Sequence, residues 1–203
     1  MRCFAVLMAA GFSRRFGKQN KLLAPFRGKP LARHTLDLVC NAGLFEKVYF
    51  VYADEAVAAL AGGLDVTTIY NPAPEKGQGE SARLGLLAAS GFFTTELHGG
   101  KTEQDYYMFF PCDQPLLDQA TVKLLLDAAR PGCIVEPACP GGNRSPTLFC
   151  ASFRDELLAL KQGEHPRLLK TRHPEAVITV EIADPSALAD IDTAEELGMR
   201  NEE

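Results

Sequence analysis

Short apolar runs alternate with segments of helical periodicity along most of this 203-residue chain. The apolar runs have the length and the β-branched or aromatic content of buried strands, which predicts strands over 4–8, 47–52, 66–70, 105–110, 133–136, 147–150 and 177–182. Helices are predicted between them, over 55–61, 77–90, 116–129, 153–160 and 166–170, with others starting near 31 and 193. This alternation predicts one α/β domain over 1–203, with a mostly parallel central sheet and helices on both faces.

The first predicted strand runs into small residues and then into a basic loop. Ala9, Ala10 and Gly11 allow close approach of the backbone to a ligand, and their N–H groups can converge on an anion. Residues 1–36 contain no Asp or Glu, although the whole chain carries a net charge of −5. The loop cations are Arg14, Arg15, Lys18 and Lys21. We therefore predict a triphosphate-binding loop rather than a nucleic-acid surface, the alternative being a solvated basic loop.

A single carboxylate follows the predicted strand at 105–110. Asp113 lies between Pro111 and Pro115, and prolines stiffen a loop because they fix φ. Ligands of open α/β sheets bind outside the carboxyl ends of the strands, so Asp113 should face the same crevice as the basic loop. A rigidly held carboxylate suits Mg²⁺, which prefers hard oxygen ligands. The alternative is an ordinary turn aspartate.

Two further carboxylates flank Ile191 near the C-terminus. In an extended segment, Asp190 and Asp192 point to the same side, which makes either a candidate second ligand of Mg²⁺. The alternative is that Asp192 caps the final helix.

The sequence shows no arrangement for nucleophilic catalysis. It contains no GxSxG motif, and we interpret the histidines at 34, 98, 165 and 173 as surface residues. A phosphate-bearing acceptor needs no protein base, because its second pKa of about 6 leaves it largely deprotonated at neutral pH. Positioning and charge neutralisation then suffice for nucleotidyl transfer.

Composition favours a cytoplasmic protein without a membrane segment. The six cysteines are scattered and form no CxxC pair, which is typical of reduced thiols. No apolar run reaches the ~18 residues needed to cross a bilayer.

Five segments resemble the MobA-like nucleotidyltransferases, and specifically the molybdenum cofactor cytidylyltransferases. AAGFSRRFGKQNKLL is similar to the family signature AAGxSxRxGxxK-LL, and NPAPEKGQGESARLGL, PCDQPLL and DIDTAEEL match further segments. RSPTLF resembles the family's Gly-x-Pro-x-x-Phe segment near the acceptor. Together these matches extend from residue 4 to residue 197. Cys112, Glu80 and the pair Arg144-Ser145 depart from the family pattern.

The resemblance implies a Rossmann-like nucleotidyltransferase fold that uses Mg²⁺. It implies transfer of CMP from CTP to the terminal phosphate of molybdopterin or the molybdenum cofactor, with release of pyrophosphate and with a molybdoenzyme as a further partner. The Ala-Ala-Gly start looks like the CTP-using branch, since the GTP-using branch tends to have Ala-Gly-Gly. The alternatives are a transferase that activates a sugar phosphate or another phosphorylated metabolite, and a non-catalytic nucleotide- or cofactor-binding partner of a molybdoenzyme.

The resemblance also implies roles for individual residues. The catalytic residues would be Arg15 and Lys21, as phosphate-contacting cations, and Asp113. Asp113 would also be the Mg²⁺ ligand, assisted by Asp190 or Asp192, while Lys18 falls at a variable position. The nucleotide would be contacted by Ala9, Ala10, Gly11, Lys21, Asn71, Gly79 and Ser81.

Overall fold

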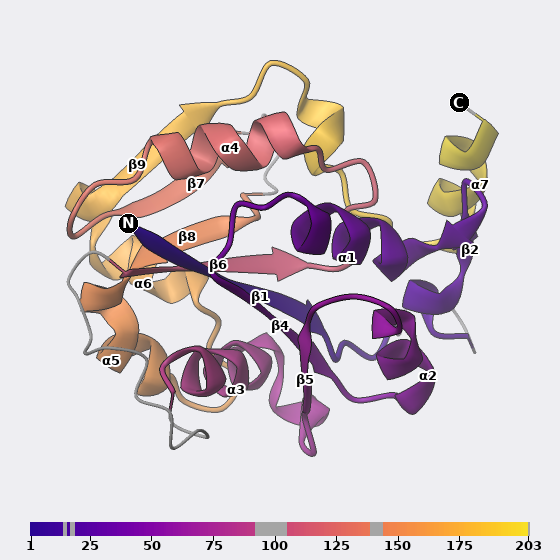
Figure 1. Cartoon of the computed structure of the whole chain (residues 1–203), viewed down its shortest axis with the longest axis horizontal. Coiled ribbons are helices and arrows are strands. Elements are labelled where there is room, and N and C mark those ends of the chain that lie inside the picture. Colours follow the sequence, from indigo (N-terminus) through magenta and orange to yellow (C-terminus); the bar gives the residue numbers. More distant parts are fainter. Residues whose placement is uncertain (14–15, 17–18, 92–104, 139–143, 203) are drawn as a thin grey trace.

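A seven-stranded sheet forms the centre of the protein, in a computed structural model that describes residues 1–13, 16, 19–91, 105–138 and 144–202 (Figure 1). Its strands, in chain order, are β1 (Arg2–Ala9), β4 (Lys47–Tyr52), β5 (Thr67–Tyr70), β6 (Asp105–Pro111), β7 (Ile134–Ala138), β8 (Thr147–Cys150) and β9 (Val177–Glu181). They lie side by side in the order β5-β4-β1-β6-β8-β7-β9. All neighbouring pairs are parallel except the two that involve β8. The predicted mostly parallel α/β sheet is confirmed.

Helices cover both faces of this sheet. Figure 1 shows α1 (Leu31–Asn41) and α4 (Gln119–Asp127) on one face and α3 (Gln78–Ala89) and α5 (Arg154–Leu158) on the other. The remaining α-helices are α2 (Glu55–Ala58), α6 (Arg167–Arg172) and α7 (Ala194–Glu202). Short 3-10 helices connect these elements: η2 (Lys21–Leu23), η3 (Ala59–Ala61), η4 (Pro74–Lys76), η5 (Ala151–Phe153), η6 (Pro174–Ala176) and η7 (Pro185–Leu188). None of the helices in the described ranges is both long and apolar enough to cross a membrane.

Local sequence explains where the elements begin and how closely they pack. Asp118 caps α4, since its carboxylate accepts a hydrogen bond from the Thr121 N–H at 2.7 Å, so the helix begins at Gln119 rather than at residue 116. A Cβ at Gly85 would lie 2.2 Å from Val6 Cγ1. The absence of a side chain at Gly85 therefore lets α3 lie close against β1.

A short hairpin is among the elements that the strand and helix prediction missed. β2 (Pro25–Phe26) and β3 (Lys29–Pro30) form a short antiparallel hairpin before α1. Its two-residue turn places both Arg27 and Gly28 in the left-handed region, with φ of 43° and 86°. Such turns suit the twist of a hairpin, but two-residue strands carry too little pattern to be recognised.

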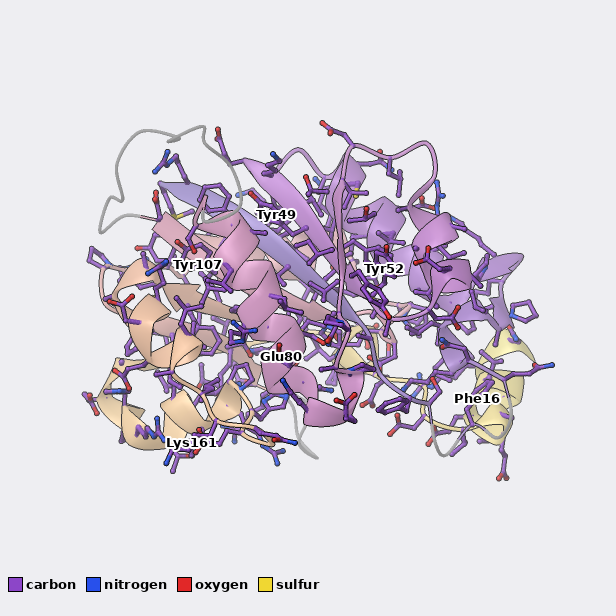
Figure 2. The ribbon with its side chains drawn as sticks, turned by 90° about the horizontal axis from the view of Figure 1, so that it is seen from below. Phe16, Tyr49, Tyr52, Glu80, Tyr107 and Lys161 are labelled. Atoms are coloured by element: carbon purple, nitrogen blue, oxygen red, sulfur yellow. The ribbon has the colours of Figure 1, made fainter. Side chains whose placement is uncertain are left out.

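A small second hydrophobic cluster joins the basic loop to the C-terminal segment. Its buried members are Phe26, Leu31 and Ile191, and Phe16 packs against them. Leu197 of α7 packs on the same cluster, and Figure 2 shows Phe16 beside that helix. The packing therefore brings the segment around Ile191 to the described part of the loop after β1.

The order of the strands fixes where a ligand can bind. The chain leaves β1 for β4 on one side, and β6 lies on the other side of β1. Ligands of such sheets bind in the crevice outside the carboxyl ends of the strands where the order reverses. Gly11 and Asp113 follow β1 and β6, and both lie at this crevice.

Candidate active site

The loop after β1 places Lys21 through two polar side chains. Asn20 caps η2, because its Oδ1 accepts the Leu22 N–H at 3.1 Å. Ser13 donates to the same Asn20 Oδ1 at 3.3 Å and accepts the Lys21 N–H at 3.2 Å. Ser13 and Asn20 thus hold the start of η2 against the beginning of the loop. Sequence reasoning assigned neither a role, although Ser13 falls on the serine of the family signature.

Lys21 lies between two carboxylates from distant parts of the chain. Its Nζ is 2.8 Å from Asp113 Oδ2 and 2.8 Å from Asp192 Oδ1. Burial by itself would lower the pKa of Lys21, but the charges and hydrogen bonds of Asp113 and Asp192 outweigh it and raise that pKa. Lys21 therefore stays charged, and the predicted approach of Lys21 to Asp113 is confirmed.

The segment at 190–192 is held directly against Asp113. The Ile191 N–H donates to the Asp113 carbonyl at 3.0 Å. Partial burial between the neighbouring segments, and secondly the negative charge of Asp113, raise the pKa of Asp190.

The final helix is capped by Thr193, so the alternative in which Asp192 caps it is wrong. Thr193 Oγ1 accepts the Glu196 N–H at 3.1 Å, and Glu196 Oε2 accepts the N–H groups of Thr193 and Asp192 at 3.0 and 2.7 Å. This is a capping box, and its Thr-x-x-Glu pattern was available in the sequence. Because Thr193 satisfies the helix end, the Asp192 carboxylate can pair with Lys21.

The carboxylates have the chemistry to hold a divalent cation with help from a substrate. Asp113 Oδ1 is buried and has no hydrogen-bond partner in the described part of the chain. No three Asp, Glu, His or Cys side chains converge as a metal cluster within the same residues. An arrangement with one or two carboxylates suits Mg²⁺, which keeps several waters and takes further ligands from phosphates.

A cavity of about 420 Å³ opens beside Lys21. This volume lies within the range of small-molecule sites, and the lining includes the polar side chains of Lys21, Ser81 and Asp113. Seven of the predicted site residues line it: Ala10, Gly11, Lys21, Ser81, Asp113, Asp190 and Asp192.

The other predicted site residues lie behind this cavity or outside the described ranges. Ala9 is buried at the end of β1. Asn71 is fully buried, and its Nδ2 donates to Ser81 Oγ at 3.1 Å. A Cβ at Gly79 would lie 2.2 Å from the Glu164 carbonyl oxygen, so Gly79 permits a close backbone contact. Arg15, like Lys18, falls outside the described residues.

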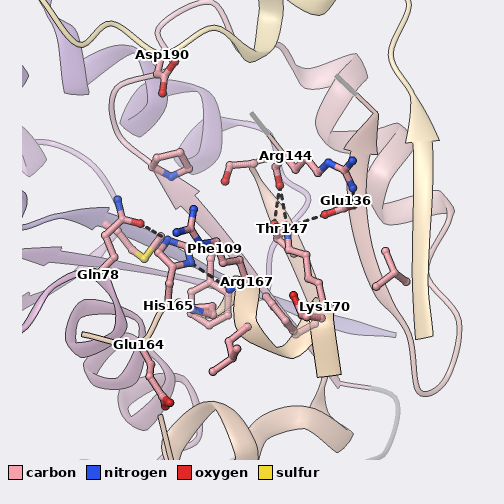
Figure 3. A pocket seen from close by; sticks show the side chains of 18 of the residues that line it. Gln78, Phe109, Glu136, Arg144, Thr147, Glu164, His165, Arg167, Lys170 and Asp190 are labelled. Carbon is pink, nitrogen blue, oxygen red and sulfur yellow. Dashed lines mark hydrogen bonds and ion pairs between the residues drawn. The ribbon is translucent and has the colours of Figure 1, made fainter. Parts of the chain in front are cut away.

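A second and larger cavity of about 1040 Å³ adjoins the first. Figure 3 shows it with Asp190 at one end and Arg144 with Glu136 on another side. Asp113, Asp190 and Gln78 line both cavities. Asp113 therefore stands at the boundary where two substrates could meet.

His165 is a partly exposed residue in the wall of the larger cavity, a position that the sequence did not predict. Its Nδ1 accepts the Arg167 N–H at 3.1 Å, which leaves the proton on Nε2 to donate to Gln78 Oε1. Burial, and then the charges of Arg167 and Lys170, lower the pKa of His165 to about 4. The imidazole is thus neutral at pH 7. The single sequence offers no signal for this contact, since it joins the start of α3 to a loop 87 residues later.

Comparisons with known proteins show what this chain is similar to. The sequence model of one family, described as the MobA-like NTP transferase domain, matches residues 5–177. The chain is 28% identical over 204 residues to molybdenum cofactor guanylyltransferase of Shewanella putrefaciens, covering 95% of this chain and 92% of that protein. It is 27% identical over 201 residues to nicotine blue oxidoreductase of Paenarthrobacter nicotinovorans, covering 95% and 93%. A nucleotidyl transferase structure from Methanothermobacter thermautotroptrophicus superposes with a TM-score of 0.81 at 22% identity, over 99% of this chain and 97% of that one.

Proposed function

Because the chain belongs to the MobA-like NTP transferase domain family, we propose that it transfers CMP from CTP to the terminal phosphate of molybdopterin or the molybdenum cofactor, releasing pyrophosphate. The observation that supports this proposal most directly is the position of Asp113. This residue lines both cavities and is paired with Lys21. The smaller cavity would hold the nucleotide, and the larger one would hold the phosphorylated pterin. We refer to them below as the nucleotide cavity and the acceptor cavity.

Transfer needs one bond to form and one to break. An oxygen of the acceptor phosphate attacks the α-phosphorus of the nucleotide, and the bond from this phosphorus to the oxygen that leads to the β-phosphate breaks. Pyrophosphate leaves with the electron pair. Since the acceptor phosphate is already ionised at neutral pH, its attack requires no protein base. The protein must therefore align the two phosphates and neutralise their charge.

Lys21 is suited to neutralise the leaving phosphates. An ammonium group has three donors, and the contacts to Asp113 and Asp192 use two of them. The third can reach a phosphate oxygen in the nucleotide cavity, whose wall includes Lys21 and the small residues Ala10 and Gly11. Arg15 would add a second cation from the same loop.

Asp113 would hold Mg²⁺ through its buried Oδ1, together with Asp190 or Asp192. The unpartnered oxygen supports this assignment. When bound, the ion would neutralise phosphate charge at the boundary between the two cavities.

GTP is the second candidate donor. The curated relative from Shewanella putrefaciens is named a guanylyltransferase, which favours GTP. The Ala-Ala-Gly segment at 9–11 favours CTP through its resemblance to the CTP-using branch. The relative named an oxidoreductase, at nearly the same identity, makes a direct assay of the reaction necessary.

One assay separates these functions. Pyrophosphate release would be measured with each of the four nucleoside triphosphates, with and without molybdopterin. We expect release with CTP and molybdopterin together. Release with GTP instead would change the donor, and release only with a sugar phosphate would change the acceptor. Binding of a nucleotide without any release would indicate a non-catalytic binding partner of a molybdoenzyme.

A further inference from the structure

The acceptor cavity contains a cluster of charged side chains away from the nucleotide. Its members are Glu136, Arg144, Arg167 and Lys170, which we call the cationic subsite. Of the described residues that line the nucleotide cavity, none belongs to this cluster. Figure 3 shows Glu136, Arg144 and Lys170 grouped on one side of the acceptor cavity, with Asp190 at another end.

Glu136 is the anchor of the subsite. Only 1% of its side chain is exposed, yet it carries two ion pairs, with Arg144 at 2.6 Å and with Lys170 at 2.7 Å. A carboxylate this deeply buried is tolerated because both of its oxygens have charged partners. It therefore fixes two cations at the wall of the cavity.

The two cations held by Glu136 differ in how many hydrogen-bond donors remain for a ligand. Lys170 uses all three of its donors, because Nζ also contacts Thr147 Oγ1 at 3.0 Å and the Arg144 carbonyl at 3.2 Å. The contact of Lys170 with the Arg144 carbonyl thus holds the main chain at residue 144 in place. The Arg144 side chain is 58% exposed, and only its NH1 group contacts Glu136. The rest of the guanidinium can form a bidentate contact with an anion.

The subsite is electropositive as a whole. Three cations and one carboxylate belong to the subsite, and two of the cations, Arg144 and Arg167, repel the charge of Lys170. Burial, and the charges of Arg144 and Arg167, lower the pKa of Lys170 in spite of its contact with Glu136. A second anion would relieve this repulsion.

From this geometry we propose that Arg144, held by Glu136 and supported by Arg167, binds an anionic group of the acceptor other than the phosphate that attacks the nucleotide. The attacking phosphate must lie within about 3.5 Å of the α-phosphorus, and hence at the boundary near Asp113. The cationic subsite lines only the acceptor cavity, so it serves a second group. The acceptor thus carries two anionic groups, and the second of them is a phosphate, a carboxylate or a thiolate. This inference rests on the proposed function for the assignment of the two cavities.

Steady-state kinetics with the proposed acceptor test Arg144. We expect Arg144→Gln to raise the KM for molybdopterin by about 10- to 100-fold, with kcat and the KM for the nucleotide nearly unchanged. Arg144→Lys should recover part of the loss, because it keeps the charge but not the bidentate geometry. Arg130→Gln is the matched control, since the hydrogen bonds that the structure describes for the Arg130 guanidinium go to main-chain carbonyls at the end of α4. An unchanged KM for the acceptor in Arg144→Gln would overturn the inference.

A binding measurement keeps the inference testable even if molybdopterin is not the acceptor. Inorganic phosphate would be titrated by calorimetry into the full-length protein with an α,β-methylene nucleoside triphosphate present to occupy the nucleotide cavity. We expect phosphate binding in the wild type and in Arg130→Gln, and at least a tenfold weaker association in Arg144→Gln. Equal phosphate binding in all three proteins, or none in the wild type, would refute the subsite. Absence of turnover in the wild type would count against the proposed function alone.

Discussion

The Lys21 ammonium donates to the Asp192 carboxylate at 2.8 Å across 171 residues of sequence. The same ammonium reaches Asp113, 92 residues away. One cation from the loop after the first strand therefore ties together the segment after β6 and the segment before α7. The removal of any of the three side chains should disturb the other two, because they share one hydrogen-bonded network.

Lys21→Ala should lower kcat by roughly 10²-fold or more, since charge stabilisation of this kind is worth a few kcal/mol. The substitution also leaves Asp113 and Asp192 facing one another without their cation. Pyrophosphate release in single-turnover and steady-state assays would measure the loss. Lys123→Ala is the control, because Lys123 forms an exposed pair with Asp127 on α4. A Lys21→Ala enzyme as active as that control would exclude Lys21 from the reaction.

Asp113→Ala should lower kcat by roughly 10²-fold or more and weaken the dependence of the rate on Mg²⁺. Asp113→Asn tests charge separately from size, because it retains the shape of the side chain. Activity as a function of Mg²⁺ concentration is the measurement, and the exposed Asp65→Asn serves as the control. Near-normal turnover of Asp113→Asn with an unchanged metal dependence would remove Asp113 from its metal-binding role.

Thr193→Ala should destabilise the protein by about 1 kcal/mol, as loss of a helix cap does. Because Thr193 and Glu196 also hold the backbone beside Asp192, activity should fall with it. Urea denaturation gives the change in stability, and Glu195→Ala, an exposed residue in the same helical turn, is the control. If both variants behave alike, the capping box has no influence on the site.

Gly79→Ala should destabilise the protein by about 1–3 kcal/mol, because overpacking forces the backbone to shift. The added methyl group would lie 2.2 Å from the Glu164 carbonyl oxygen, which is main chain and cannot rotate away. In contrast, Gly198→Ala in α7 meets nothing within 4 Å and should be neutral or stabilise by up to about 1 kcal/mol. Thermal unfolding of the two variants compares them directly, and similar melting temperatures would contradict the close contact.

The stability of the wild type should depend on the protonation of His165. Its pKa in the folded protein is about 4, below the ordinary value of 6.5, so the unfolded chain binds the proton more tightly. Stability should therefore fall as the pH decreases from 6.5 towards 4. His165→Gln should show a smaller fall over this range. Denaturation curves at several pH values test the difference, and identical slopes for the two proteins would show that His165 is not held neutral.

The sequence predicted most of the fold because the signals for its elements are local. The strand at 47–52, for example, follows from an apolar run within six consecutive residues. The helix predicted over 55–61 is instead α2 followed by η3, since residues near a helix end readily tighten into 3-10 geometry.

The part of the candidate site that was predicted from position in the chain lies in the loops after β1 and β6. Asp113 and Lys21 could be assigned to one crevice because the carboxyl ends of parallel strands share an edge. The contact between Gln78 and His165, and the ion pairs of Glu136, depend on how α3, β7 and α6 come together in three dimensions. Such contacts between distant segments leave no pattern in a single sequence.

Because β8 runs antiparallel to its neighbours, the two cavities take residues from different kinds of loop. Gly11 and Asp113 come from loops that leave parallel strands, whereas Arg144 lies in the segment that enters β8. Under the proposed function, substitutions at this entrance would change which acceptor is recognised and would leave the loops of the nucleotide cavity unchanged. In evolution, a family built on this plan could exchange acceptors while its donor chemistry stayed intact.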